Sequence, residues 1–563
     1  MSRLDCPKLE RCPGCPLGGK PYAAGVLQKE QEVRDVLASF ATLKPAIPPA
    51  RAASPTLAYR LRAKLVAQNR ALGLYERGSH RVVDVSGCRV LSMSLTAASE
   101  ALRRALPLPI HGADLRETES GVLVTLLTDS EPARAELEQA AQALLATGTV
   151  SSVAISVRPE GSVRLLAGEP EVVAGPQVSR HRLSEEAPYA YAAHGGFVQA
   201  HGGQARQVQR DIAAGLAERC GGLPGCRVLE LFAGNGSLAL ALARAGAEVT
   251  AVEAYAPAIA LAERAAREQG LRLRAVADDA GRFLRKHAAS FDALVVNPPR
   301  RGLESGLRRA LRAASPRAVA YLSCNPQTLA RDLGHLQQLG LGVVSVEPLD
   351  MIPWSDAVEV LCWLEPCAPP AARVLFEDDH WQALDKPPYE RLSGADHVVV
   401  PAQLGAETSG VVFRAKTPNA AASLRQALLD AEREFTLLVR GNLRKQGTVA
   451  RRHQSPATCG ARYKKQASVG RHSLVSALLK DVDEDAALRD FASIGHPVLG
   501  DGHYGDARSN QHLEHRHGLD RAFVHCTAVR LRSHTGEELH VRSELPPDLA
   551  QVLASLSSDQ PAM

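Results

Sequence analysis

Residues 227 to 253 carry the pattern that most restricts the fold of this chain. A short apolar run from Arg227 to Leu231 leads into the turn Phe-Ala-Gly-Asn-Gly, and an apolar run with helical character follows it. A second apolar run ends in Glu253. Glycines at such a turn let the backbone come close to a ligand where a helix begins, as in doubly wound α/β sheets. A carboxylate after the next strand can accept hydrogen bonds from ribose hydroxyls. The pattern predicts an α/β domain that binds a nucleotide.

The glycine turn also narrows the choice of nucleotide. Gly234 and Gly236 are present, but the third glycine of the dinucleotide fingerprint is missing. A dinucleotide-dependent dehydrogenase is therefore the alternative that the turn alone leaves open. A later apolar run, Ala293 to Val296, ends in Asn-Pro-Pro-Arg-Arg-Gly. Asn-Pro-Pro at a strand end is typical of S-adenosylmethionine methyltransferases that act on planar substrates, so the sequence favours a methyltransferase.

Cys324 stands in the string Tyr-Leu-Ser-Cys-Asn-Pro, directly after the apolar run Ala318 to Leu322. A cysteine attacks as the thiolate, and a turn at the end of a strand gives a thiol more access than a packed core does. The alternative is a buried structural cysteine, because free cysteines are commonly buried. The neighbouring motifs favour a nucleophile.

These motifs together make residues 1 to about 365 resemble the RNA 5-methyluridine methyltransferases, especially the iron-sulfur branch that modifies 23S ribosomal RNA. Seven strings carry the resemblance, in the same order as in the family: Tyr-Arg-Leu-Arg-Ala-Lys-Leu (59 to 65), Gly-Ser-His-Arg-Val-Val-Asp (78 to 84), Phe-Val-Gln (197 to 199), the glycine turn, Asn-Pro-Pro-Arg-Arg-Gly (297 to 302), Ser-Cys-Asn-Pro with Thr-Leu-Ala-Arg-Asp-Leu (323 to 333), and Asp-Met-Ile-Pro with Val-Glu (350 to 359).

The resemblance implies a role for each matching residue. Cys324 would add to carbon 6 of uracil, and Glu359 would be the general base that removes the proton from carbon 5. The alternative for Glu359 is an ordinary glutamate in a strand. Residues expected to bind S-adenosylmethionine are Gln199, Phe232, Ser237, Glu253, Asp279 and Asn297.

The chain departs from the family pattern at four positions. Asn297 stands where Asp is usual, Ala233 where Cys is common, His201 where Asn follows Phe-Val-Gln, and Ala357 where a His lies near the base. The change to Asn297 removes a charge, which puts the affinity for the methyl donor or the turnover in question.

Four cysteines form a second candidate site. Cys6, Cys12 and Cys15 have the spacing Cys-x5-Cys-x2-Cys, and Cys88 is a distant fourth ligand. Four thiolates suit zinc or a 4Fe-4S cluster, and the spacing by itself favours zinc. The iron-sulfur members of the family share this spacing, so the resemblance implies a 4Fe-4S cluster. The oligonucleotide-binding barrel that usually precedes the motif is not expected, because the motif begins at the sixth residue.

Composition suggests a cytoplasmic protein that contacts RNA. The chain has eleven cysteines, which fit ligands and a nucleophile in a reducing compartment better than a disulfide scaffold. No signal peptide or membrane-spanning run is expected. The net charge is only +5, but residues 51 to 90 hold eight Lys or Arg and two acids, and residues 440 to 471 hold nine and no acid. Such stripes are often solvated faces, yet on an RNA enzyme they fit phosphate contacts. A monomer is expected.

Residues 373 to about 555 resemble the large-subunit type of RNA pseudouridine synthase, without its catalytic residues. The matching strings include Asp-Lys-Pro-Pro (385 to 388), Glu-Thr-Ser-Gly-Val-Val (407 to 412), Ile-Gly-His-Pro-Val-Leu-Gly-Asp (494 to 501) and Phe-Val-His-Cys (523 to 526). The family's catalytic Asp falls in the segment Ala402-Gln403-Leu404-Gly405, where its position is Gly405. The family's basic stretch becomes Asp483, Glu484 and Asp485, which would repel phosphates. Glu407 is a poor substitute, so this domain is expected to be inactive.

The sequence thus predicts an α/β protein of three domains. Residues 1–195 form an α+β RNA-binding domain with the cysteine cluster, 196–365 a class I (Rossmann-like) methyltransferase domain, 366–372 a linker, and 373–563 an α+β pseudouridine synthase-like domain. The expected function is formation of 5-methyluridine in 23S ribosomal RNA. Transfer RNA as the substrate, or a non-catalytic role in RNA binding or ribosome assembly, are the alternatives.

Overall fold

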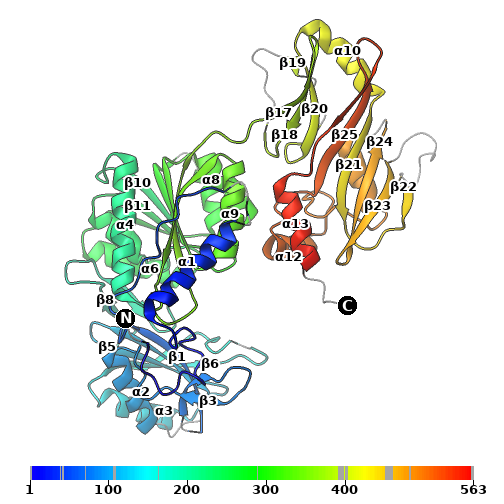
Figure 1. The fold of residues 1–563 in the computed structure, drawn as a ribbon. Coiled ribbons are helices and arrows are strands. Elements are labelled where there is room, and N and C mark those ends of the chain that lie inside the picture. Colours follow the sequence, from blue (N-terminus) through cyan, green and yellow to red (C-terminus); the bar gives the residue numbers. More distant parts are fainter. Residues whose placement is uncertain are drawn as a thin grey trace. The chain divides into compact units, whose positions relative to one another are not determined.

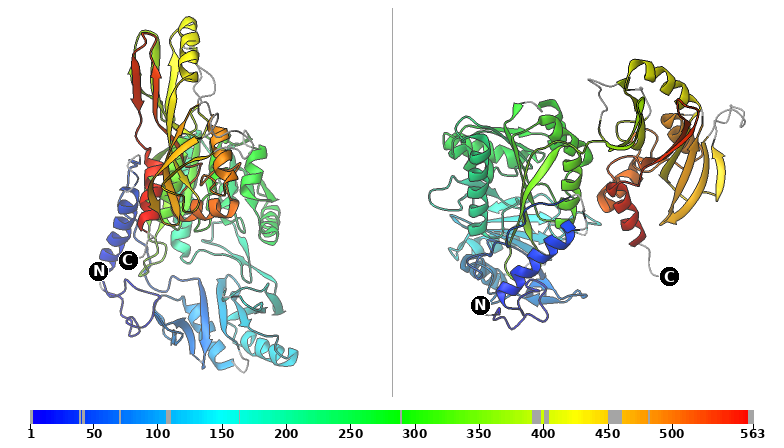
Figure 2. Two further views of the ribbon diagram at one scale, coloured as in Figure 1. Left: turned by 90° about the vertical axis from the view of Figure 1, so that its right-hand side faces the viewer. Right: turned by 45° about the horizontal axis from the view of Figure 1, so that its top comes forward.

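The chain forms two compact units. The computed structural model describes residues 3–38, 40, 43–69, 71–105, 110–162, 164–287, 290–390, 398–399, 404–449, 461–480 and 483–558. Residues 1–39, 44–329 and 343–366 make up the first unit, and residues 40–43, 330–342 and 367–563 the second. Figures 1 and 2 show the elements of each unit.

The first unit contains a seven-stranded sheet in the order β3-β2-β1-β4-β5-β6-β7. Its helix α2 places Leu95, Ala98 and Leu102 on one face, which packs onto the sheet together with α3. Side chains of β4 point alternately to the two faces of the sheet. Ala113 and Leu115 lie in this core, so Asp114 and Arg116 point to the opposite face. The elements are α1 (Tyr22–Ala38), β1 (Arg62–Gln68), β2 (Ala71–Tyr75), β3 (Val82–Asp84), α2 (Met93–Ala105), β4 (Gly112–Thr118), β5 (Gly121–Thr128), α3 (Arg134–Leu145), β6 (Val150–Val157) and β7 (Glu171–Ala174), followed by the separate pair β8 (Val178–His181) and β9 (Ala190–Ala193).

A second seven-stranded sheet of this unit has the order β12-β11-β10-β13-β14-β16-β15. Its strands β10 to β14 run parallel, and β16 pairs antiparallel with β14. Apolar residues of α4, α5 and α6 cover one face, and Figure 1 shows α8 on the other side of the sheet from α4. The elements are α4 (Gly202–Cys220), β10 (Arg227–Leu231), α5 (Ser237–Arg244), β11 (Glu248–Glu253), α6 (Ala256–Glu268), β12 (Leu273–Ala277), α7 (Ala280–His287), β13 (Ala293–Val296), α8 (Ser305–Ala314), β14 (Ala318–Ser323), α9 (Pro326–Gln338), β15 (Leu341–Leu349) and β16 (Glu359–Pro366). Most of α9 and the first residues of β15 are counted with the second unit.

A small core joins the N-terminal cysteine segment to the loop between β15 and β16. Tyr22, Tyr59 and Trp354 are buried in it, with Cys6, Cys15 and Cys88 packed against them. Beside this core the carboxylate of Asp350 is almost fully buried, and it accepts hydrogen bonds from Lys29 Nζ and Tyr22 Oη at 2.6 Å each. The segment that leads to Glu359 is therefore fixed by contacts with helix α1.

The second unit contains a ten-stranded sheet, antiparallel except where β20 and β25 run parallel. Its core includes Trp381, Phe413, Phe435 and Phe491. The elements that follow the irregular residues 367–372 are β17 (Arg373–Glu377), β18 (Trp381–Lys386), β19 (Val398–Val399), β20 (Ser409–Ala415), α10 (Pro418–Leu429), β21 (Glu432–Val439), β22 (Gln446–Val449), β23 (Ala461–Val469), β24 (His472–Leu479), α11 (Glu484–Ser493), α12 (Ala507–His517), β25 (Val524–Arg532), β26 (Glu538–Arg542) and α13 (Pro547–Ser558). Within the described parts of the chain, every helix is too short or too polar to cross a bilayer.

The buried pair of Lys29 and Asp350 yields a stability prediction. Replacing Lys29 by Met leaves the Asp350 carboxylate buried without its cation, which typically costs about 3–5 kcal/mol. We expect Lys29→Met to lower the urea concentration at the midpoint of unfolding of the first unit. Lys20→Met, at an exposed position, is the matched control and should leave the midpoint nearly unchanged. Equal midpoints for both variants would show that the pair contributes little.

Candidate active site

The order and direction of the strands bring the predicted residues to one edge of the second sheet. Strands β10, β11, β13 and β14 are parallel, so their carboxyl ends lie at the same edge. Strand β16 runs the other way, and its residue Val360 pairs with Ser323. The next residues outward, Cys324 and Glu359, therefore lie opposite each other at that edge.

The glycine turn after β10 has an unusual backbone. Phe232, Gly234 and Gly236 all have positive φ angles, of 62°, 56° and 72°. Glycine adopts such angles without a steric penalty, whereas Phe232 does so at some cost. A Cβ atom on Gly236 would lie 2.5 Å from Ala262 Cβ, so glycine is required for the close packing of this turn on α6. The turn thus holds the N-terminus of α5 near the end of β11.

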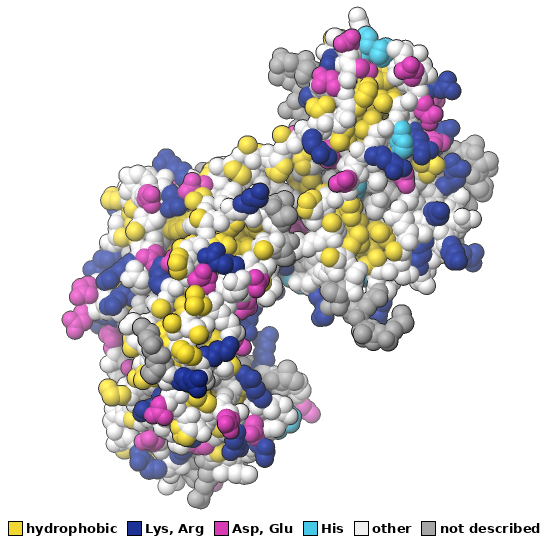
Figure 3. Space-filling view, viewed as in Figure 1, with side chains coloured by type: hydrophobic (Ala, Val, Ile, Leu, Met, Phe, Trp, Pro, Cys, Tyr) yellow, Lys and Arg dark blue, Asp and Glu magenta, His cyan; other side chains and the backbone are white. Residues whose placement is uncertain are grey.

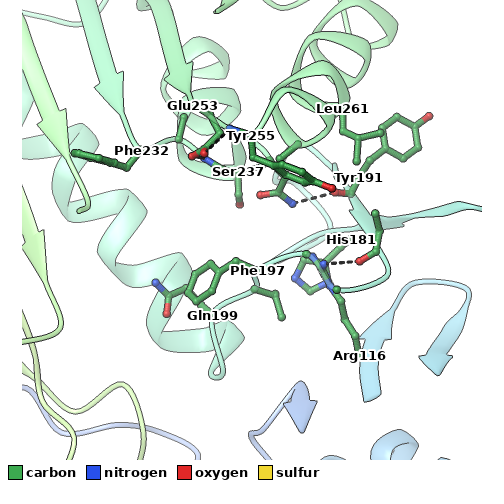
Figure 4. Close-up of a pocket in the computed structure, with 18 of the residues that line it drawn as sticks. Arg116, His181, Tyr191, Phe197, Gln199, Phe232, Ser237, Glu253, Tyr255 and Leu261 are labelled. Atoms are coloured by element: carbon green, nitrogen blue, oxygen red, sulfur yellow. Dashed lines mark hydrogen bonds between the residues drawn. The ribbon is translucent and has the colours of Figure 1, made fainter. Parts of the chain in front are cut away.

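Glu253 at the end of β11 organises this turn. Its carboxylate accepts hydrogen bonds from the backbone N–H of Gly234 at 3.1 Å and of Tyr255 at 3.0 Å. A carboxylate has about four acceptor positions, so it can still accept hydrogen bonds from a ligand. The hydroxyl of Ser237 accepts a hydrogen bond from Gln209 Nε2 at 3.0 Å. Both side chains are thereby fixed in the orientations seen in Figure 4.

A cavity of about 520 Å³ lies against the turn, in the size range of small-molecule sites. It brings together five of the six residues expected to bind the donor: Gln199, Phe232, Ser237, Glu253 and Asn297. Figure 4 shows Gln199 and Phe197 across the cavity from Glu253 and Ser237.

Asp279, the sixth residue, is exposed and lies outside the described lining of the cavity. Its Oδ1 accepts a hydrogen bond from Arg282 N at 2.9 Å in the first turn of α7. A part in donor binding therefore stays a prediction for Asp279. Sequence reasoning missed Tyr255, an exposed ring that lines the cavity two residues after Glu253. An aromatic residue so soon after the predicted ribose ligand is the signal that could have found it.

Cys324 and Glu359 both have raised pKa values. Burial raises the pKa of the Cys324 thiol, the negative charge of Glu359 raises it further, and Arg300 lowers it. Burial raises the pKa of Glu359 to about 7, and Arg300 opposes that shift. The backbone oxygen of Arg300 accepts hydrogen bonds from Asn325 Nδ2 and Thr328 Oγ1, both at 3.1 Å, which tie the loops after β13 and β14 together. Arg300 belongs to a matching string, but no role was predicted for it from the sequence.

His201, one of the departures from the family pattern, is a structural residue. It is buried, stacks on Tyr59 with ring centroids 4.9 Å apart, and its Nδ1 accepts a hydrogen bond from Gln204 N at the start of α4. Its other nitrogen lies 2.9 Å from Pro55 O. This histidine therefore fixes the segment that follows Gln199.

The four N-terminal cysteines are near neighbours in space. Burial raises the pKa of Cys15 to about 12, and the charges of Cys88, Cys12 and Cys6 add to that effect. Burial also raises the pKa of Cys12, with Cys88 and Cys6 again contributing. Over the described residues, however, no three His, Cys, Asp or Glu side chains are placed closely enough to hold a metal ion. The four thiols have the chemistry of a metal or cluster site, but they would have to move closer together to bind one.

In the second unit the position of the absent aspartate is bordered by another carboxylate. Gly405 N donates to Glu484 Oε2 at 3.0 Å, the hydroxyl of Thr408 donates to Glu484 Oε1, and burial raises the pKa of this carboxyl. A Cβ atom on Gly405 would lie 3.2 Å from Glu484 Oε1. Ala402 and Gln403 lie outside the described residues. The carboxylate of Glu484 thus lies beside Gly405, where the family's catalytic Asp is expected.

Several known proteins are similar to parts of this chain. Residues 228–317 match the family described as "Methyltransferase domain". The chain is 30% identical to an uncharacterized RNA methyltransferase of Thermosynechococcus vestitus, over 64% of this chain and 84% of that protein. It is 27% identical to the 23S rRNA (uracil(747)-C(5))-methyltransferase of Vibrio cholerae, over 63% and 97%.

One solved structure resembles the first unit at the level of the fold. It is the tRNA (uracil-54, C5)-methyltransferase of Pyrococcus abyssi in complex with S-adenosyl-L-homocysteine, with 22% identity, a TM-score of 0.51, and coverage of 63% of this chain and 86% of that one. The second sheet has the class I fold of S-adenosylmethionine-dependent methyltransferases. The chain belongs to the RNA methyltransferase family.

The opposing effects of Glu359 and Arg300 on Cys324 can be tested without substrate. Removing a negative neighbour lowers a thiol pKa and removing a positive one raises it. We expect alkylation of Cys324 by iodoacetamide at pH 8 to be faster in Glu359→Gln and slower in Arg300→Gln than in the parent chain. Peptide mass spectrometry reports Cys324 separately, and exposed Cys367 is the internal control. Changes of the same sign in both variants would contradict this geometry.

Proposed function

We propose that this chain methylates carbon 5 of a uridine in RNA, with 23S ribosomal RNA as the favoured substrate. The observation that carries the proposal is the opposition of Cys324 and Glu359 across strands β14 and β16, beside Asn297 at the neighbouring strand end. Two similar proteins are, by their names, uracil-C5 methyltransferases of 23S rRNA and of tRNA. The predicted nucleophile and base thus lie together next to the cavity that we assign to the methyl donor.

The chemistry of uracil explains why two such groups are needed. Carbon 5 is a weak nucleophile until the Cys324 thiolate adds to carbon 6, which places an enolate in the ring. S-adenosylmethionine supplies the methyl group from a positively charged sulfonium. Glu359 then removes the proton from carbon 5, and the bond between carbon 6 and sulfur breaks to restore the double bond and release the thiolate.

The electrostatics of the site suit these roles. A base works best when its pKa is close to the working pH, and Glu359 has a pKa raised to about 7. Both neighbours act on Cys324 in a way that the reaction can use. Arg300 lowers its pKa, and protonation of Glu359 would remove the charge that raises it. The thiolate is therefore favoured while Glu359 is protonated, and Glu359 must release that proton to solvent before its carboxylate can accept the one on carbon 5.

Different residues of the cavity would bind different parts of the methyl donor. Glu253 would accept hydrogen bonds from the ribose hydroxyls, and the exposed ring of Tyr255 offers a surface for the adenine. Gln199 and Asn297 line the cavity, as does Leu322, two residues before Cys324. This arrangement directs the methyl group toward the pair of reactive side chains. Asp279 would act only at the outer side of the adenine.

We also propose that Cys6, Cys12, Cys15 and Cys88 hold a 4Fe-4S cluster. Cys12 and Cys15 have raised pKa values, so these two thiols remain protonated unless positive charge is supplied, and a metal centre would supply it. Methyl transfer from a sulfonium needs no electron, so the cluster would have a structural role. It would fix the core of Tyr22, Tyr59 and Trp354 described above.

For the second unit we propose a pseudouridine synthase-like domain without that activity. Gly405 has no side chain to act as a nucleophile, and Glu484 is engaged with Gly405 and Thr408. The domain would help to target or stabilise the enzyme on RNA.

The catalytic proposal predicts different outcomes for the two residues. RNA from cells expressing Cys324→Ala should lose one 5-methyluridine, mapped by mass spectrometry in ribosomal and transfer RNA. Glu359→Gln should accumulate an RNA–protein adduct that survives denaturing electrophoresis in the presence of the donor, because the carbon 5 proton cannot leave.

The matched control for Cys324→Ala is Cys367→Ala, which removes an exposed thiol and should leave methylation unchanged. Full 5-methyluridine in Cys324→Ala cells would reject the mechanism. The same map tests the second unit, because loss of a pseudouridine in cells lacking the gene would show that this domain is active.

The cluster proposal is tested by metal analysis. Protein purified without oxygen should contain iron and acid-labile sulfide, together with a charge-transfer absorption in the visible range. Cys15→Ala should lose both, while Cys220→Ala, which alters a half-buried thiol outside the group, should retain them. Zinc in place of iron would reject the cluster and keep a metal site, and no metal in either protein would reject both.

A further inference from the structure

Arg116 in β4 is a buried cation that the proposed chemistry does not use. Its side chain is 3% exposed, and it lies on the face of the first sheet opposite the helices. It also lines the cavity at the glycine turn. Figure 4 places Arg116 with His181 and Phe197 on one side of the cavity, across from Glu253 and Ser237.

The hydrogen bonds of this guanidinium are incomplete. Nη1 donates to Ala193 O at 3.1 Å, but Nε and Nη2 are buried and have no partner. These two nitrogens form the edge of arginine that binds an oxyanion in bidentate fashion. The adjacent Arg62 uses this same edge to bind Asp114, with Nε–Oδ1 and Nη2–Oδ2 distances of 3.0 and 2.7 Å. The carboxylate nearest to Arg116 is therefore already occupied.

The two histidines beside Arg116 carry no compensating charge. Burial lowers the pKa of His181 to about 4, and Arg116 lowers it further. Burial also lowers the pKa of His194 to about 4, and both of its ring nitrogens lie within 3.0 Å of hydroxyls, those of Thr125 and Ser152. His181 Nε2 is buried without a partner. A full positive charge and an unpaired imidazole nitrogen thus lie side by side.

We propose that Arg116 binds a backbone phosphate of the RNA substrate through Nε and Nη2. A buried guanidinium with two unsatisfied donors is costly, and two charge-assisted hydrogen bonds to one phosphate would satisfy both Nε and Nη2. The inference rests on the proposed RNA substrate and adds an RNA contact at a residue that the sequence motifs do not indicate.

The charges around Arg116 favour RNA over the carboxylate of the methyl donor. Arg62 pairs directly with Arg116 across the strands, and Lys64 pairs with Asp114, so these cations share one face of the sheet. Lys64 is exposed and Arg62 is partly so. Three cations and one acid therefore extend from solvent to the cavity, as suits a chain of phosphates. On the face shown in Figure 3, Lys and Arg otherwise lie scattered among acidic and apolar side chains.

The loop Ala193–Gly196 covers the guanidinium and would have to shift for a phosphate to reach it. A Cβ atom on Gly196 would lie 2.9 Å from Arg116 Nη1, so glycine allows the close approach of this loop. Gly195 has a φ of 73°, which glycine tolerates readily. RNA binding would exchange the contact with Ala193 O for contacts with phosphate.

The test compares RNA binding with donor binding in three variants. Arg116→Gln removes the charge, Arg116→Lys keeps the charge without the bidentate edge, and Arg104→Gln removes an exposed arginine of α2 as the matched control. Affinity for a 23S ribosomal RNA fragment is measured by filter binding at several salt concentrations in the Cys324→Ala background. Affinity for S-adenosylmethionine is measured by calorimetry.

We expect Arg116→Gln to weaken RNA binding about tenfold or more, as for loss of a charged hydrogen-bonded contact. The slope of log affinity against log salt should fall by about one. Arg116→Lys should recover the slope but not the full affinity, and donor affinity should stay within about twofold in all variants, because no donor contact is lost. If Arg116→Gln does not fold, Arg116→Lys still tests the proposal. An RNA affinity of Arg116→Lys equal to that of the parent chain would reject it.

Two results would overturn the inference. RNA affinity and salt slope unchanged in Arg116→Gln would show that the cation does not contact phosphate. Weaker donor binding with unchanged RNA binding would instead assign the arginine to the donor carboxylate. Neither result requires methylation, so a failure of the proposed uracil chemistry, seen as normal RNA binding without 5-methyluridine, remains distinguishable.

Discussion

The antiparallel pairing of β16 with β14 is the constraint on which the active site depends. In a sheet of parallel strands only the ends of strands reach the ligand edge. Inserting one reversed strand brings the beginning of that strand to the same edge, so Glu359 faces Cys324. No parallel strand could supply this pair, because its first residue would lie at the far edge. The predicted base is thus placed by topology, and its raised pKa follows from burial there.

The N-terminal segment supports this pairing from outside the sheet. Asp350 lies nine positions before Glu359, and its buried carboxylate is bound by Lys29 and Tyr22 of α1. The same core contains Trp354 and three of the four cysteines. A change in the cysteine segment would therefore act on the loop that precedes the base. This link gives a physical reason for the structural role that we propose for the cluster.

Arg116 connects the first sheet of the first unit with the cavity at the second sheet. The cavity takes its donor-facing residues from the second sheet and Arg116 from the first. Burying a guanidinium with unsatisfied donors is costly in a folded protein. Its presence beside the cavity therefore indicates an anionic ligand. The proposed phosphate contact would connect RNA held on the first sheet with the chemistry on the second.

The sequence alone determined the local parts of this protein. The glycine turn and the strand ends at Glu253, Val296 and Ser323 are set by short strings whose backbone needs are local. Five of the six expected donor residues gather at the cavity for the same reason.

The tertiary structure decided what depends on contacts between distant segments. The influence of Arg300 on Cys324 and Glu359, the exposure of Asp279 outside the cavity, the stacking of His201 on Tyr59 and the unpaired edge of Arg116 could not be predicted. Each depends on which side chains of remote strands share a face or an edge, and that follows from strand order and register rather than from neighbours in the chain.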